Sequence, residues 1–187
     1  LVLAALAVSV LTSCVEAELD VQLRENGTVR MDFRYTVADE LLLTGAPETA
    51  QEFWLLPLRR EDFRRLADFT PGLSLRRYRA RNRGEETVVF ARLEAESITA
   101  ANAVLAPGTG AGIRRAAGEG AASLVVLEPL PTSGRSIAST AGAADIVLDV
   151  TFTASEGEAS GTWSLDELLS SDAAVVLRVD GNSGEQQ

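Results

Sequence analysis

The sequence contains neither histidine nor lysine, and all 17 of its basic residues are arginine. These absences exclude catalytic triads that use histidine, His-ligated metal centres, Schiff-base chemistry and the lysine of a phosphate-binding P-loop. Because there is one cysteine, an internal disulfide and a thiolate metal cluster are excluded as well. An enzyme would have to work with carboxylates, hydroxyls, arginine and tyrosine, and nothing in the sequence implies a metal or a cofactor.

Residues 1–13 have the composition of a targeting segment. Leu1 to Leu11 form an uncharged apolar run of signal-peptide length, too short for a membrane-spanning helix, and two small polar residues separate this run from Cys14. The run lacks an initiator methionine and a basic region before it, so we interpret residues 1–13 as a lipoprotein signal peptide truncated at its front.

The stretch Leu11-Thr12-Ser13-Cys14 is similar to the lipobox of bacterial lipoproteins. The resemblance implies that Cys14 carries palmitate-type acyl chains, starts the mature protein and tethers it to a bilayer of the cell envelope. It also implies an outer-membrane or cell-surface address rather than the inner membrane, because Val15 stands where the inner-membrane retention signal has Asp. The alternative is a buried free cysteine in an N-terminal strand.

Alternation of apolar and polar residues predicts two β-hairpins. The first spans residues 17–37, and a three-residue loop that pairs Leu23 with Val29 keeps both apolar rows on one face, with Gly27 left-handed in a bulge. The second spans residues 73–95. With Arg83-Gly84 as its central pair, Tyr78 is expected opposite Val89 and Arg76 opposite Ala91.

Helices and further strands follow from spacing and capping signals. We expect short helices at 38–43, 59–69 and 97–105, the second with Phe63, Leu66 and Phe69 at helical intervals and the third capped by Ser97 or Thr99, a Gly/Ala-rich loop at 108–122, strands at 123–127, 145–153, 161–165 and 173–179, and a polar tail at 181–187. The sequence therefore predicts one α+β domain over residues 14–180, in which an antiparallel sheet of hairpins packs with a few short helices.

The order of these elements resembles the LppM-type family of bacterial envelope lipoproteins. The pattern comprises a lipobox Cys14 that leads into a hairpin at 18–37, a strand pair at 73–96 that runs into a helix at 98–105, and a late strand followed by Thr162-Trp163. The resemblance implies a mixed domain outside the cytoplasmic membrane that is not an enzyme and can hold a lipid or glycolipid.

Charge is distributed unevenly along the chain. Residues 59–92 hold ten arginines and five acids, a net charge of +5, whereas the remaining residues carry −15 of the total of −10. Arg76, Arg77, Arg79 and Arg81 are therefore candidates for binding anionic lipid headgroups or acidic glycans. The alternative is a solvated surface whose arginines pair with local acids. Export and the net negative charge disfavour nucleic acid as a partner.

An uncharged segment with Phe53, Trp54 and Leu56 is a candidate apolar ligand pocket, although core packing is the alternative. Trp163 is expected in the core. The acid pairs Glu156/Glu158 and Asp145/Asp149 fit a solvated face better than a catalytic pair. We expect a non-catalytic binding module. The alternative is a structural lipoprotein that docks a protein partner in the envelope.

Overall fold

The computed structural model describes residues 15–38, 59–84, 86–105, 112–115, 121–127, 146–164, 167 and 174–179. Cys14 and the candidate pocket residues Phe53, Trp54 and Leu56 lie outside these ranges, as does most of the helix expected at 38–43. The elements in chain order are β1 (Val15–Leu23), β2 (Val29–Ala38), α3 (Arg60–Phe69), β3 (Leu73–Arg83), β4 (Glu86–Ala95), α4 (Ile98–Leu105), β5 (Gly112–Arg115), β6 (Ala122–Leu127), β7 (Ile146–Ala154), β8 (Gly157–Ser164) and β9 (Val175–Val179).

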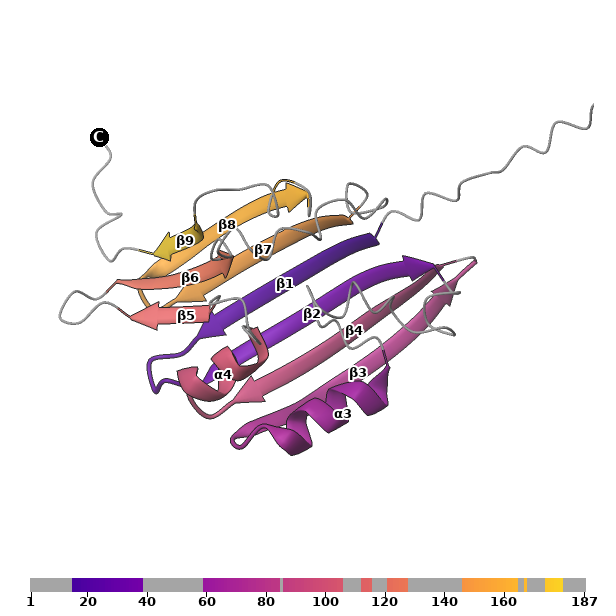
Figure 1. Cartoon of the computed structure of the whole chain (residues 1–187), viewed down its shortest axis with the longest axis horizontal. Helices are drawn as coiled ribbons and strands as arrows, with labels where there is room; N and C mark the ends of the chain where they lie inside the picture. Colours follow the sequence, from indigo (N-terminus) through magenta and orange to yellow (C-terminus); the bar gives the residue numbers. More distant parts are fainter. Residues whose placement is uncertain are drawn as a thin grey trace, which may run out of the picture.

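Most of the described structure is sheet. Six strands form one sheet in the order β3-β4-β2-β1-β7-β8, and three more form a small sheet in the order β5-β6-β9 (Figure 1). Of the neighbouring pairs, β1 and β7 alone run parallel, so the expectation of an antiparallel sheet is wrong at this position. Strands joined by a tight turn must run antiparallel, whereas β7 comes from the C-terminal half of the chain and is free of that constraint. Strands from the N-terminal and the C-terminal half of the chain thus share one sheet.

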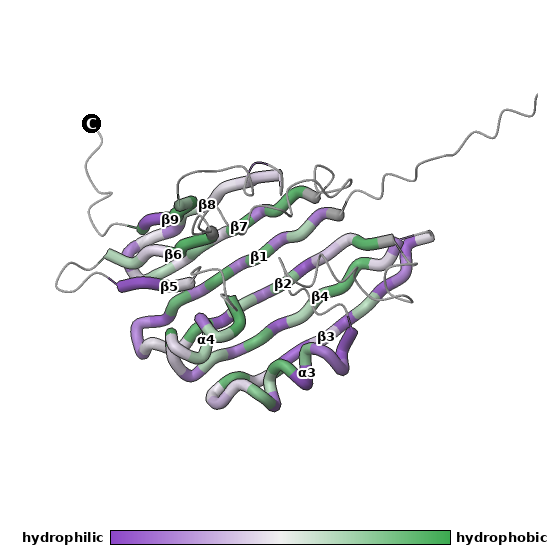
Figure 2. Tube along the Cα trace, viewed as in Figure 1, coloured by the Kyte–Doolittle hydropathy of each residue, from purple (hydrophilic) through white to green (hydrophobic). Residues whose placement is uncertain are grey.

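The core lies on one face of the large sheet. The elements α3, α4 and the small sheet cover this face, and the alternation of apolar and polar residues is visible along β1, β2 and β4 (Figure 2). Four aromatic rings pack in a continuous series across it, with centroids 5.9–6.3 Å apart, in the order Tyr35, Phe33, Phe63 and Tyr78. The opposite face carries the polar residues.

The first hairpin has the predicted register. Leu23 pairs with Val29, and Gly27 adopts a φ of 80° and donates its backbone N–H to the carbonyl of Arg24 at 2.9 Å. The positive φ favours glycine at this position. The turn places both apolar rows on the core face, as the sequence requires.

The register predicted for the second hairpin is wrong. Tyr78 lies opposite Ala91 rather than Val89, because Gly84, with a φ of 81°, is the first of the two turn residues and not the second. This shift of two residues keeps every side chain after Arg76 on its predicted face. A bulge between Leu75 and Arg77 moves Arg76 itself off the apolar face, where the predicted pairing with Ala91 had placed it.

The helix α3 confirms the prediction for residues 59–69, but its last residue points outward. Phe63 is fully buried, whereas 81% of Phe69 is exposed. Phe69 follows Phe63 by six positions, and at about 100° per residue the two lie on different sides of the helix. Among the described residues, no helix has the length and the apolar composition to cross a bilayer.

The predicted loop at 108–122 contains a strand, β5. The side chain of Asn102 on α4 accepts a hydrogen bond from the backbone N–H of Ile113 at 2.7 Å and donates one to its carbonyl at 3.0 Å. Ile113 is buried in the core. A side chain of another element thus fixes a segment whose own composition is typical of a loop.

Ser97 rather than Thr99 caps α4, since its hydroxyl accepts the N–H of Ala100 at 3.2 Å.

Candidate functional site

The charge on the polar face of the large sheet changes from positive at its β3 edge to negative toward its centre. One row of side chains crosses β3, β4, β2, β1 and β7 as Arg77, Arg92, Asp32, Asp20 and Thr151. On β1 the same face presents Glu16, Glu18 and Asp20. The positive charge of the sheet is therefore concentrated at β3, and the arginines closer to the centre face acids.

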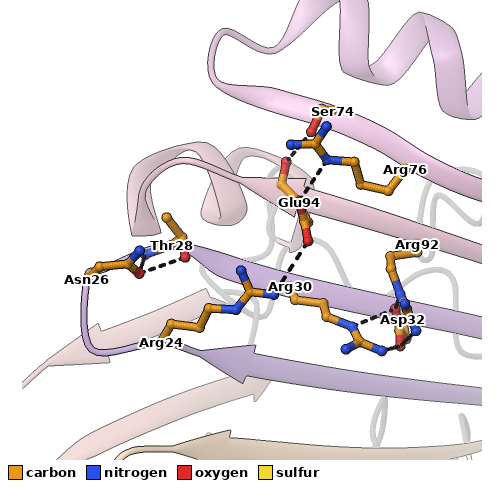
Figure 3. Close-up of polar contacts among 9 residues, drawn as sticks. All are labelled: Arg24, Asn26, Thr28, Arg30, Asp32, Ser74, Arg76, Arg92 and Glu94. Carbon is orange, nitrogen blue, oxygen red and sulfur yellow. Dashed lines mark hydrogen bonds and ion pairs between the residues drawn. The ribbon is translucent and has the colours of Figure 1, made fainter.

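Asp32 is the central acid of this face. Arg92 donates two hydrogen bonds to its carboxylate, at 2.7 Å from Nε and 2.8 Å from Nη2, and Arg30 donates two more, at 2.6 Å from Nη2 and 3.4 Å from Nε (Figure 3). Burial alone would raise the pKa of Asp32, but the hydrogen bonds from the two guanidinium groups outweigh it and hold that pKa below its ordinary value. The same contact raises the pKa of Arg92. The guanidinium groups of Arg30 and Arg92 are therefore both paired with Asp32.

Three further arginines of the face also have acidic partners. Glu94 of β4 accepts Nε of Arg76 at 2.7 Å and lies 3.5 Å from Nη2 of Arg24, so the two guanidinium groups approach it from opposite sides (Figure 3). Arg34 pairs with Glu18 at 3.2 Å. Arg76, one of the four predicted anion-binding residues, is thus brought to an acid of its own sheet, as the alternative interpretation expected.

Arg77, Arg79 and Arg81 differ from these five. They are exposed on one face of the edge strand β3, and the residues opposite them on β4 are Arg92, Phe90 and Val88, none of them acidic. Among the residues that the structure describes, these three arginines form no ion pair. Alternate residues of a strand are about 7 Å apart. We call Arg77, Arg79 and Arg81 the arginine row.

Phe90 lies in the middle of the basic part of the face. It is directly opposite Arg79 on β3 and Arg34 on β2, and Cζ of Arg77 and of Arg92 lie 5.8 and 5.7 Å from its ring centroid. A guanidinium group held over an aromatic ring loses orientational freedom while its N–H groups stay available. Phe90 was not among the site residues predicted from the sequence. It could have been recognised in the sequence as an aromatic residue at a polar-face position of a strand in which apolar and polar residues alternate.

Two acids of the pairs named from the sequence accept hydrogen bonds from threonine hydroxyls. Asp149 accepts the hydroxyl of Thr162 at 2.5 Å, and Glu158 accepts that of Thr153 at 3.3 Å. Asp145, the other half of one expected pair, lies outside the described residues. Within the described ranges, no three potential ligands come together as they would to hold a metal ion. Trp163 is half-buried and packs against the core.

Asp20 and Glu156 differ from these acids, because each has a buried carboxylate oxygen without a hydrogen-bond partner. In Asp20 this atom is Oδ1, whereas Oδ2 accepts Nε2 of Gln22 at 3.1 Å. Burial raises the pKa of Asp20, and the neighbouring charges of Asp32 and Glu158 raise it further. Asp20 and Asp32 face each other across β1 and β2. Their pKa values are therefore shifted in opposite directions.

No protein-family model matches this chain, and no curated protein sequence matches it.

Proposed function

We propose that this protein is a non-catalytic binding module of the bacterial cell envelope, and that the arginine row holds the anionic headgroup of a lipid or glycolipid. One observation carries the proposal. Five arginines of the polar face, at positions 24, 30, 34, 76 and 92, are matched with acids, whereas Arg77, Arg79 and Arg81 stand exposed on an edge strand with no acid opposite them. If the arginines only kept the protein soluble, there would be no reason for five of them to be paired with acids while three neighbouring ones have no acid opposite.

Guanidinium groups suit such a ligand chemically. They stay charged at any physiological pH and bind phosphate and carboxylate oxygens through two parallel hydrogen bonds. Each arginine near an anionic membrane surface contributes about 1 kcal/mol, so three give about 3 kcal/mol, or roughly a hundredfold in affinity. The ring of Phe90 supports the proposal because it orients Arg77, 5.8 Å from its centroid.

The proposal includes a lipid anchor at Cys14 and an outer-membrane or cell-surface location. Two acyl chains give stable attachment, since each buried CH₂ contributes about 0.8 kcal/mol. Attachment also raises the effective concentration of membrane headgroups around the tethered domain. Mass spectrometry of the protein extracted from its own membrane tests this part. The proposal expects an acylated Cys14 as the first residue, and an unmodified Cys14 still preceded by Ser13 would contradict it.

Headgroup binding is tested on the full chain in zwitterionic detergent. The probes are a fluorescent short-chain phosphatidylglycerol and, in a second arm, an acidic oligosaccharide without acyl chains. The double variant Arg79→Gln/Arg81→Gln is expected to bind phosphatidylglycerol roughly 30-fold more weakly, since it loses about 2 kcal/mol. Binding in the first arm alone identifies a lipid, and binding in both identifies a shared anionic group.

The matched control is Arg115→Gln/Arg178→Gln. It removes the same charge from exposed positions on β5 and β9 of the small sheet. The proposal expects this variant to bind like the wild type. An equal loss in both double variants would mean that only net charge matters, and the arginine row would then not be a site.

The alternative is an assembly lipoprotein that docks a protein partner. It is favoured by the unpaired outer edges of β3 and β8 in the described sheet, because such edges can accept a further strand. Native mass spectrometry of the extracted protein separates the two functions. Copurified lipid on a monomer supports headgroup binding, and a stoichiometric protein complex without lipid supports docking.

A further inference from the structure

Phe69 is the most exposed large apolar side chain among the described residues. It ends α3, where 81% of it is accessible, although Phe63 of the same helix is fully buried. The other exposed large apolar residue is Val147, at 37%, on β7. The two lie on different elements, so they do not form the contiguous apolar patch that a protein-docking site requires. Phe69 is an isolated aromatic group that the fold presents to its surroundings.

Phe69 belongs to a part of the fold that is basic overall, and its net charge comes from β3. The helix α3 carries exposed arginines at 60, 64 and 65, but its acids at 61, 62 and 68 balance them. The helix packs through Phe63 against the core-face side of β3, the strand of the arginine row, at the edge of the sheet (Figure 1). Arg65 precedes Phe69 by four residues and shares its side of the helix. Between Arg60 and Arg83 there are eight arginines and three acids. We call α3 and β3 together the basic edge.

We propose that the basic edge rests on an anionic lipid bilayer and that Phe69 inserts into the interface between headgroups and acyl chains. The inference rests on the proposed function and narrows it, because the partner becomes a bilayer surface rather than a dispersed anion. Basic elements with an aromatic side chain bind such interfaces, since arginines pair with the headgroups while the aromatic ring leaves water. Long arginine side chains can lie along the interface with their charged ends in water.

Insertion is measured with a tryptophan placed at the exposed position. The full chain with Phe69→Trp is reconstituted with vesicles of phosphatidylcholine alone or with an equal share of phosphatidylglycerol, and brominated acyl chains quench any tryptophan that reaches them. The parent chain, with Trp54 and Trp163, gives the background. Val147→Trp is the matched control, since it puts a tryptophan at the other exposed apolar position, on the polar face of the sheet.

We expect F69W to be quenched and blue-shifted in the vesicles with phosphatidylglycerol and not in phosphatidylcholine alone, and V147W to be quenched in neither. A second variant, Phe69→Ala, is expected to weaken binding of anionic vesicles about tenfold while leaving the affinity for short-chain phosphatidylglycerol in detergent unchanged. Equal quenching of F69W in both kinds of vesicle, or of F69W and V147W alike, overturns the inference.

The failure of this inference can be told apart from failure of the proposed function. If F69W is not quenched and Phe69→Ala binds anionic vesicles normally, but Arg79→Gln/Arg81→Gln still loses headgroup affinity, the arginine row binds headgroups without insertion. If neither the arginines nor Phe69 affect binding, both proposals are wrong.

Discussion

Arg92 of β4 donates two parallel hydrogen bonds to Asp32 of β2, at 2.7 and 2.8 Å. Paired hydrogen bonds between a guanidinium and a carboxylate are among the stronger polar contacts in proteins, and only 13% of the Asp32 side chain is exposed. The side chain of Arg92 thus has an acidic partner within the sheet, whereas the side chain of Arg77, which faces it across β3 and β4, has none among the described residues. Arginines held by an acid of the sheet can therefore be distinguished from arginines whose N–H groups are free to bind a ligand.

Replacing Asp32 with Asn is expected to lower the free energy of unfolding by about 2 kcal/mol at pH 7, because Arg30 and Arg92 lose their charged acceptor. Urea unfolding measures the change. Arg92→Gln and the double variant complete a thermodynamic cycle, and a coupling energy near zero would show that the two residues act independently.

The contribution of Asp32 depends on pH with a defined sign. Its folded-state pKa lies below the ordinary value of 3.8, so the unfolded chain binds the proton more tightly. The stabilisation is therefore complete above the unfolded-state pKa and is lost as the pH falls through the folded-state pKa. Wild type and Asp32→Asn should converge in stability in that acidic range, and a difference that is constant with pH would contradict this.

Asp20→Asn is expected to change the free energy of unfolding in the opposite direction. The folded-state pKa of Asp20 is raised by burial and by neighbouring acids, so its ionised form costs stability above that pKa. At pH 7 the variant should be more stable than the wild type, by on the order of 1 kcal/mol, because no charge remains beside Asp32. The gain should vanish as the pH is lowered below the unfolded-state pKa. A destabilised variant at pH 7 would show that the charge of Asp20 is needed.

Asn102→Asp tests the link between α4 and β5. The aspartate could still accept the N–H of Ile113, but it could not donate to the carbonyl that Asn102 Nδ2 now contacts at 3.0 Å. A loss of about 1–3 kcal/mol in unfolding free energy is expected at neutral pH. Protonation of the new carboxyl supplies a donor, so part of the loss should be recovered in acid. Hydrogen exchange at the Ile113 amide reports whether β5 opens.

Gly161→Ala is expected to destabilise β8 by about 1–3 kcal/mol, because a methyl group at Gly161 would overlap the indole ring of Trp163 on the same face of the strand. Tryptophan fluorescence should show the displaced ring. Gly27→Ala is a useful comparison, since the space around it is open and its cost comes only from the positive φ, about 1 kcal/mol. An unchanged emission spectrum in Gly161→Ala would contradict the expected clash.

Local signals were sufficient for the first hairpin and for the helices α3 and α4. Loop length and alternation leave one register that puts Leu23 and Val29 on the same face, and Ser97 marks the start of α4. The second hairpin was harder, because two consecutive polar residues, Arg76 and Arg77, do not reveal which of them is bulged. The sequence indicated strands there but not their exact pairing.

Contacts between distant segments could not be read from the sequence. Alternation identifies β7 as a strand, but it does not show that the strand runs parallel to β1. The strand β5 depends on the side chain of Asn102, which lies on another element. The candidate site shows the same division. The sequence indicated that Arg77, Arg79 and Arg81 share a face, whereas the pairing of Arg76 with Glu94 required the register of the whole sheet.

The most direct test observes the arginine side chains themselves. In ¹⁵N-edited NMR spectra of the full chain in zwitterionic micelles, the Nε–Hε signals are followed as phosphatidylglycerol is added. We predict that the signals of Arg77, Arg79 and Arg81 shift with a common saturation curve, while those of Arg30 and Arg92, which are held by Asp32, stay in place. Largest shifts at Arg115 and Arg178, or equal shifts at all arginines, would contradict the assignment of the arginine row as the binding site.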